Sequence, residues 1–470
     1  MDRGGLSPGS AADILRGVRA DWLGGTPVLH ARPAAGGRFD WHVLAPGEAP
    51  RPLTAALTSV PSRLAAVSAD ALTLFADGGL WAVGPDGARR LGPPDRALRE
   101  PVISDPEPVL RLKLNDAPRR AWVPALGADG ESLVVAADGG VRRLGPGAGA
   151  ETRVLAAAPD AALVLDRAGL VETLRLRTAD GDRALGRVNA ARADVVLTEP
   201  RPVAHRDALG RETRSWLFLP PARPVRGLVV QVYPGSVHAG VWSGPMTLTY
   251  GVRPVILAGA GYVVLTPSMP IDGAATASAD FWTRSVDLAV DAALAAHPDL
   301  PADRIAVMGH SFGGHAALAI AARSTRYRSY IASSAMSDLF GEWGEFIPAT
   351  RHLPEDGMMM GAQQAWVEGG QGALGAPPWA DPAAYVERSP WLAADRITAP
   401  VLLITADRDF VPMSQSERMF SALHRGGGTA RLVTYRGEHH HLWSPANIRD
   451  LYAQVLGWLD QTLAAPAAPP

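Results

Sequence analysis

Two patterns of hydrophobic residues divide the chain near residue 200. Before that point, short apolar strands alternate with glycine-rich turns. Residues 71–92 and 132–147 each contain an apolar strand, an Asp-Gly-Gly turn and a strand that alternates apolar and polar residues. Residues 161–181 follow the same plan. Hairpins repeated at intervals of some tens of residues are typical of β-propeller blades, and an irregular all-β sandwich is the alternative.

The length of this first region limits what it can form. A four-stranded propeller blade needs about 40 to 45 residues, so only four or five blades fit. We therefore expect residues 1–198 to form a propeller-like domain that is small, incomplete or cut off at its N-terminus.

Longer and more uniformly apolar runs follow. The expected strands are 215–219, 227–233, 261–267, 304–310, 329–335, 400–406 and 430–435. The helix-like segments between and after them are 283–296, 313–324, 414–425 and 445–463. Strands without a polar face indicate a mostly parallel sheet covered on both sides. The alternation predicts a doubly wound α/β domain over residues 199–465, with a disordered tail at 466–470.

A Gly-x-Ser-x-Gly pattern occurs twice, around Ser7 and around Ser311. Ser7 follows no strand and stands among turn-forming residues. Ser311 follows the apolar strand 305–308 and precedes an alanine-rich helix at 315–322, which is the context of a nucleophile turn. Flanking glycines clear space in so tight a turn, and the helix N-terminus directs N–H groups at an oxyanion. A purely structural serine is the alternative.

A serine nucleophile needs a histidine base and a carboxylate that orients the base. In α/β-hydrolases these follow the serine in the order Asp, His, each after a later strand. The candidates are Asp407 and Asp409 after strand 400–406, and His439, His440 and His441 after strand 430–435. Position alone leaves both choices open. Consecutive histidines on an extended loop point in different directions and no carboxylate cluster accompanies them, so we expect no metal or other cofactor.

Composition narrows the possible functions further. The net charge of -2 gives no reason to expect nucleic acid or an anionic membrane as a partner. The chain has no cysteine, which excludes a cysteine nucleophile, disulfides and thiolate metal sites. The N-terminus lacks the apolar core of a signal peptide, and no run of about 18 apolar residues predicts a membrane span. We expect a cytoplasmic protein, an expectation that an upstream segment would change.

Residues 195–463 resemble the catalytic domain of the prolyl oligopeptidase family of serine peptidases. The segment "GHSFGGHAALA" is similar to the family's nucleophile segment and implies Ser311 as the nucleophile. The segment "LLITADRDFVPMSQSERMFSAL" matches a family stretch with a carboxylate shortly before Val-Pro, which implies Asp409 as the acid. "YRGEHHHLWSPANIRDLY" resembles the Gly-Glu-Gly-His segment, with His439 in the usual place of glycine, and implies His440 as the base.

The resemblance also implies an oxyanion hole and shows two departures. "VQVYPGS" is similar to a tyrosine-glycine segment of the family, so the donors would be the Tyr233 hydroxyl and the Phe312 backbone N–H. Without the resemblance, Tyr233 would be expected to pack on the core at a strand end. Many members have an Arg-Gly-Ser-rich turn where this chain has "TPSMPIDGAA". The N-terminal half is also about half the usual propeller length.

These inferences predict a serine hydrolase that cleaves peptide bonds of short peptides through an acyl-enzyme intermediate. A carboxylic-ester hydrolase with the same residues is the first alternative, because nothing in the triad separates esters from amides. A non-catalytic binding protein is the second.

Overall fold

The chain was analysed as a computed structural model. It describes residues 6–7, 20–33, 37–61, 63–100, 121–128, 130–145, 152–222, 224–236, 251–273, 275–345 and 362–464. Two compact units divide the chain, Met1–Val196 and Leu197–Pro470. The tail expected at 466–470 and most of the motif around Ser7 lie outside the described residues.

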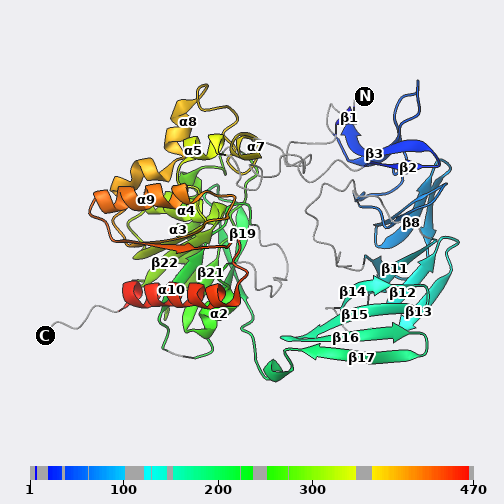
Figure 1. Cartoon of the computed structure of the whole chain (residues 1–470), viewed down its shortest axis with the longest axis horizontal. Helices are drawn as coiled ribbons and strands as arrows, with labels where there is room; N and C mark the ends of the chain where they lie inside the picture. Colours follow the sequence, from blue (N-terminus) through cyan, green and yellow to red (C-terminus); the bar gives the residue numbers. More distant parts are fainter. Residues whose placement is uncertain are drawn as a thin grey trace. The chain divides into compact units, whose positions relative to one another are not determined.

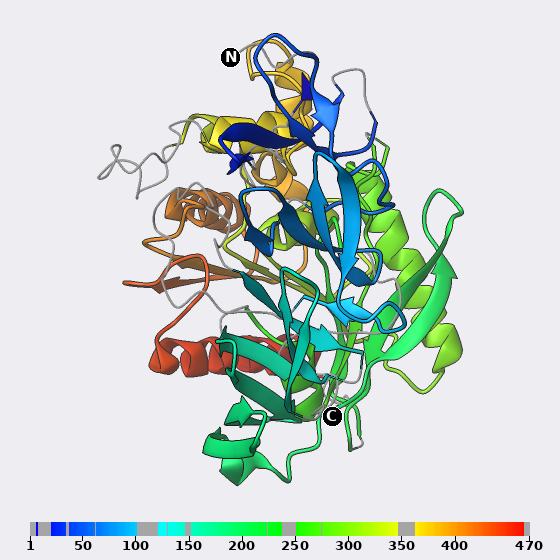
Figure 2. The same ribbon diagram turned by 90° about the vertical axis from the view of Figure 1, so that its right-hand side faces the viewer.

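Within the described residues, the first unit contains four antiparallel sheets that follow one another along the chain (Figures 1 and 2). The first contains β1 (Leu6–Ser7), β2 (Ala20–Leu23), β3 (Thr26–Pro33), β4 (Asp40–Val43) and β5 (Arg51–Pro52). The second contains β6 (Ala66–Val67), β7 (Leu72–Ala76), β8 (Gly79–Gly84) and β9 (Gly87–Leu91). The third contains β10 (Leu98–Arg99), β11 (Trp122–Gly127), β12 (Ser132–Ala136) and β13 (Val141–Gly145). The fourth contains β14 (Thr152–Ala157), β15 (Ala161–Ala168), β16 (Val171–Thr178) and β17 (Gly181–Val188), and a short 3-10 helix follows at Ala190–Arg192.

These sheets stack as propeller blades do, which confirms the propeller-like prediction. Buried apolar clusters join the first sheet to the second, the second to the third, and the third to the fourth. Representative members of the three clusters are Trp41 with Leu74, Leu80 with Val135, and Leu126 with Val164. In the described part of the chain no such cluster joins the fourth sheet to the first. The last strand, β17, is exposed along its whole length.

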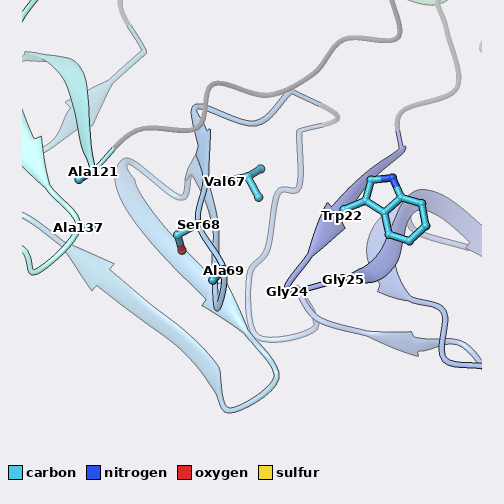
Figure 3. A pocket seen from close by; sticks show the side chains of 8 residues that line it. All are labelled: Trp22, Gly24, Gly25, Val67, Ser68, Ala69, Ala121 and Ala137. Carbon is cyan, nitrogen blue, oxygen red and sulfur yellow. The ribbon is translucent and has the colours of Figure 1, made fainter.

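Tight turns bring these strands together. Between β7 and β8, Asp77 and Gly78 have φ angles of 48° and 68°, as a type I′ hairpin turn requires. Gly24 lies between β2 and β3, and a Cβ there would lie 2.6 Å from the Ala69 carbonyl oxygen. This close approach forms one wall of an open pocket of about 600 Å³ (Figure 3). Its other lining residues are Trp22, Gly25, Val67, Ser68, Ala121 and Ala137.

The second unit is built on one eight-stranded sheet in the described residues. Its strands are β18 (Arg201–Arg206), β19 (Glu212–Phe218), β20 (Gly227–Gln231), β21 (Tyr262–Thr266), β22 (Ile305–His310), β23 (Ser329–Ser333), β24 (Val401–Ala406) and β25 (Ala430–Tyr435). The spatial order is β18-β19-β21-β20-β22-β23-β24-β25. The pairs β18–β19 and β19–β21 are antiparallel, and all pairs from β21–β20 onward are parallel. This mixed, mostly parallel sheet is the predicted α/β-hydrolase fold.

Helices cover both faces of the sheet (Figure 1). They are α2 (Pro254–Gly259), α3 (Ala279–Ala296), α4 (Phe312–Ala321), α5 (Leu339–Gly344), α7 (Ala362–Gly369), α8 (Pro382–Glu387), α9 (Met413–Arg425) and α10 (Pro445–Leu463), with a 3-10 helix at Pro390–Arg396. Along β20, Leu228 and Val230 enter the core shared with α3, α4 and α9, whereas Val229 enters the core shared with α2 and α10. No helix in the described residues is long and apolar enough to cross a membrane.

Candidate active site

The carboxyl ends of the parallel strands bring the predicted site residues to one edge of the sheet. Tyr233 follows β20, Ser311 follows β22, and Asp409 follows β24. His440 follows β25, the next strand along that edge. In open α/β sheets, ligands bind in the crevice outside these strand ends. The topology therefore gathers residues that are far apart in the sequence.

Ser311 occupies a strained turn between β22 and α4. Its backbone angles are φ 60° and ψ -126°, a conformation that residues with a side chain rarely adopt. The Ser311 N–H donates to the Ser333 carbonyl oxygen at 2.8 Å, and the Ser311 carbonyl accepts from the His315 N–H at 3.0 Å. The turn is thus held from β23 and from the helix that it begins, as in a nucleophile elbow.

The glycines around Ser311 are required by close backbone contacts. A Cβ at Gly309 would lie 2.0 Å from the Gly313 carbonyl oxygen, and one at Gly313 would lie 2.3 Å from the Val232 carbonyl oxygen. A Cβ at Gly314 would lie 2.7 Å from that of Ala335. Side chains at these positions would push β20, β23 and α4 apart. The steric reason expected from the sequence therefore holds in the folded chain.

His440 is paired with a buried carboxylate. Its Nδ1 lies 2.7 Å from Oδ1 of Asp409, and the same oxygen accepts from the Val411 N–H at 2.9 Å. Asp409 is only 1% exposed. An Nδ1–H donated to this carboxylate makes Nε2 the basic nitrogen of the ring, which is the tautomer that a general base needs.

Two of the other candidates from the sequence, Asp407 and His439, lie apart from this pair. The Asp407 carboxylate accepts from the Gly437 N–H at 2.7 Å, so it ties the loop after β24 to the loop after β25. His439 is exposed. His441 lies in the same pocket as His440, with ring centroids 5.1 Å apart. The structure thus brings Asp409 to His440 and leaves Asp407 and His439 apart from that pair.

Glu438 fixes the loop that carries His440. Its buried carboxylate accepts from the backbone N–H groups of Trp443 and Ser444, at 2.7 and 3.1 Å, and from the Asn447 side chain at 2.7 Å. Burial alone would raise the pKa of Glu438, but these hydrogen bonds lower it to about 2. An ionised Glu438 therefore holds the loop closed against the start of α10.

His310 adds a neutral ring beside His440. The two ring centroids lie 4.6 Å apart, and Nδ1 of His310 lies 3.2 Å from the Ser333 hydroxyl. Burial holds the pKa of His310 well below its ordinary value, and nearby His440 and His441 lower it further. His310 is therefore an uncharged wall of the site. This position of His310 was not predicted from the sequence, although His310 is the variable residue before Ser311 in the motif.

A pocket of about 450 Å³ contains Ser311 and His440 together. The other residues that line it are Tyr233, His310, Met336, Glu342, Gln363, Trp366, Gln371, Phe410, Val411 and His441. Several of these come from α5, α7 and the residues around them, between β23 and β24. No motif in that segment could have identified them, because its residues meet Ser311 only through the fold.

The two predicted oxyanion donors lie beside Ser311. Tyr233 lines the pocket, and its ring packs so closely that a Cβ at Gly313 would lie 3.1 Å from Cδ2. Phe312 is buried and is the first residue of α4. The first N–H groups of a helix have no partner within the helix and carry the positive end of its dipole. Both donors are therefore placed next to Ser311.

The chain matches a known family over the part that contains the serine, aspartate and histidine positions. The profile of the prolyl oligopeptidase family matches residues 287–466, a range that includes Ser311, Asp409 and His440 and leaves out Tyr233. A probable chloroplastic glutamyl endopeptidase from Arabidopsis thaliana is 34% identical over 86 residues. That stretch is 18% of this chain and 9% of the relative.

Solved structures show the same fold over nearly the whole chain. An acylaminoacyl peptidase from Pyrococcus horikoshii is 15% identical with a TM-score of 0.55, and the alignment covers 97% of this chain and 72% of the other. The dipeptidyl peptidase 4 of Porphyromonas gingivalis is 14% identical with a TM-score of 0.56, covering 93% and 62%. At these identities the likeness establishes a common fold.

Proposed function

Residues 287–466 form a prolyl oligopeptidase family domain, and on that premise we propose that the chain is a serine peptidase that cleaves short peptides through an acyl-enzyme intermediate. The observation that carries the proposal is the pairing of His440 with Asp409 in the pocket that contains Ser311. Peptidase names among the similar structures support a peptide substrate.

The reaction divides into acylation and deacylation. His440 Nε2 takes the proton from Ser311 as the hydroxyl oxygen attacks the substrate carbonyl, and then gives it to the leaving amine as the C–N bond breaks. Water, deprotonated by the same nitrogen, then attacks the acyl carbon. The bond to the Ser311 oxygen breaks, His440 returns the proton to that oxygen, and the carboxylic acid product leaves. Asp409 holds the ring in its tautomer and stabilises the imidazolium.

Charge on the attacked oxygen is stabilised by the Tyr233 hydroxyl and the Phe312 backbone N–H. A preorganised donor of this kind contributes about 3 to 4 kcal/mol of transition-state stabilisation. Neither group needs to reorganise during the reaction, because Tyr233 packs on Gly313 and Phe312 is fixed at the start of α4.

Two measurements test the proposal. A fluorophosphonate should modify Ser311, which peptide mapping by mass spectrometry would locate. Comparing kcat/KM for peptide amides and short acyl esters then separates a peptidase from an esterase. Turnover of esters alone would overturn the peptide substrate, and an unmodified Ser311 would favour a binding protein.

Tyr233→Phe should lower kcat by about 10² to 10³, because it removes one donor from the developing oxyanion. The ring remains, so the packing against Gly313 and the thermal unfolding midpoint should not change. Steady-state kinetics on a peptide amide give the first quantity and a melting curve the second. An unchanged kcat would remove Tyr233 from the oxyanion hole.

A further inference from the structure

Glu342 places a buried carboxyl group in the same pocket as Ser311. It lies on α5, is 1% exposed, and lines the pocket with Ser311 and His440. Its Oε1 accepts a hydrogen bond from the Gln363 side chain, while Oε2 is buried with no hydrogen-bond partner. A buried carboxyl oxygen without a partner costs free energy, so its presence calls for a ligand that would satisfy it.

The surroundings of Glu342 favour the approach of a positive charge. Burial, together with the nearby acids Glu345, Asp409 and Asp338, raises the pKa of Glu342 to about 8. Asp338 already pairs with Arg418, and Asp409 with His440. No ion pair reaches Glu342 itself among the described residues. A cation that enters the pocket would therefore meet a carboxyl group that has no counter-ion in the described part of the chain.

One part of the pocket wall suits a long apolar stem. Met336 and Val411 are buried apolar side chains, and Trp366 and Phe410 add two aromatic rings. Lysine and arginine side chains combine such a stem with a cationic end. A side chain next to the attacked carbonyl must lie close to Ser311, and the pocket of about 450 Å³ has room for one of this size.

We propose that Glu342 binds the cationic end of the substrate side chain beside the scissile carbonyl, so that the protein prefers peptides with lysine or arginine at that position. This inference rests on the proposed peptidase function. It assigns Glu342 to substrate selection and gives it no part in the bond-breaking steps. The alternative occupant is an uncharged hydrogen-bonding side chain, such as that of glutamine, paired with a protonated Glu342.

Matched substrates separate these occupants. Peptide amides that differ only in arginine against citrulline keep the length of the side chain while removing its charge. Those that differ in lysine against norleucine keep the four-carbon chain and remove the charged amino group at its end. We expect kcat/KM to be at least about tenfold higher for the charged member of each pair. Equal values for arginine and citrulline would overturn the proposal, because an uncharged hydrogen bond would then explain the site.

Two variants test whether Glu342 is responsible for the preference for a charged side chain. Glu342→Gln should bring the arginine-to-citrulline ratio close to one. Glu417→Gln removes an exposed carboxylate on α9 that does not line the pocket, so the ratio should persist. Fluorophosphonate labelling of Ser311 shows that each variant is folded at the site. A labelled Glu342→Gln variant that keeps the full ratio would contradict the role of Glu342.

The charge preference should also depend on pH. Below about pH 8 the carboxyl of free Glu342 is protonated, so a cation must displace a proton to pair with it. The arginine-to-citrulline ratio should therefore rise about tenfold between pH 7 and pH 9. The bond-breaking steps through His440 are the same for both substrates and cancel from the ratio. Glu345→Gln removes a carboxylate that raises the pKa of Glu342, so the rise in the ratio should move to lower pH.

The same measurements distinguish a failure of the charge preference from a failure of the peptidase function on which it rests. A protein that is labelled at Ser311 and hydrolyses all four substrates at similar rates overturns the charge preference and retains the peptidase function. A protein that is not labelled and hydrolyses none of them overturns both.

Discussion

Ser311→Ala is expected to lower kcat for peptide hydrolysis by about four to six orders of magnitude. The substitution removes the oxygen that forms the acyl-enzyme and leaves the oxyanion donors and the pocket in place. Residual activity over water would then come from binding and electrostatic stabilisation alone. Single-turnover kinetics on a peptide amide, with loss of fluorophosphonate labelling, measure the effect.

Ser7→Ala is the matched control, because Ser7 stands at the centre of the other Gly-x-Ser-x-Gly sequence. It should keep both kcat and labelling. Alanine at 311 must adopt the same strained φ of 60° as serine, so thermal unfolding should be compared for the two variants. A folded Ser311→Ala protein with near-normal kcat would show that another residue is the nucleophile.

The sheet of the second unit was largely predictable from the sequence. Its central strands are buried on both faces, so each appears as an apolar run, and the polar residues after β22, β24 and β25 stand out against them. Strand β18 was missed for the opposite physical reason. At the edge of the sheet, four of its six residues are exposed, and Val203 alone is buried.

The pocket walls could not be predicted from the sequence. Glu342 and Trp366 lie on short helices between β23 and β24, and their sequence spacing gives no sign that they meet Ser311. The approach of α5 and α7 to the strand ends depends on tertiary packing. The residues that would contact a substrate side chain could therefore be identified only in the folded chain. The reaction type could be inferred earlier, from the polar residues that follow the strands.

In the first unit, too, some features could be predicted from the sequence and others could not. Asp-Gly turns predict hairpins locally, since φ above zero at both central residues favours that pair. How successive hairpins stack depends on contacts such as those of Trp41 and Val164, which belong to different clusters. The repeated hairpins could therefore be recognised in the sequence. For the number of blades, the sequence provided only an upper limit, set by the length of the region.

His440→Ala should lower kcat by about 10⁴ to 10⁶, an effect as large as that of Ser311→Ala. The variant lacks the ring that pairs with Asp409 and takes the proton from the serine hydroxyl. The same loss should appear in the rate of fluorophosphonate labelling, because labelling also needs an activated hydroxyl. Stopped-flow acylation and labelling rates at neutral pH measure both effects.

His439→Ala provides the comparison, since it makes the same substitution one residue earlier on the same loop. His439 is exposed, and the loop is held by Glu438 through Trp443 and Ser444, so this variant should keep most of its activity. The double variant should be no slower than His440→Ala alone, because the base has already been lost. If His439→Ala abolished turnover while His440→Ala retained it, the base would be His439, and the contact of His440 with Asp409 would be structural.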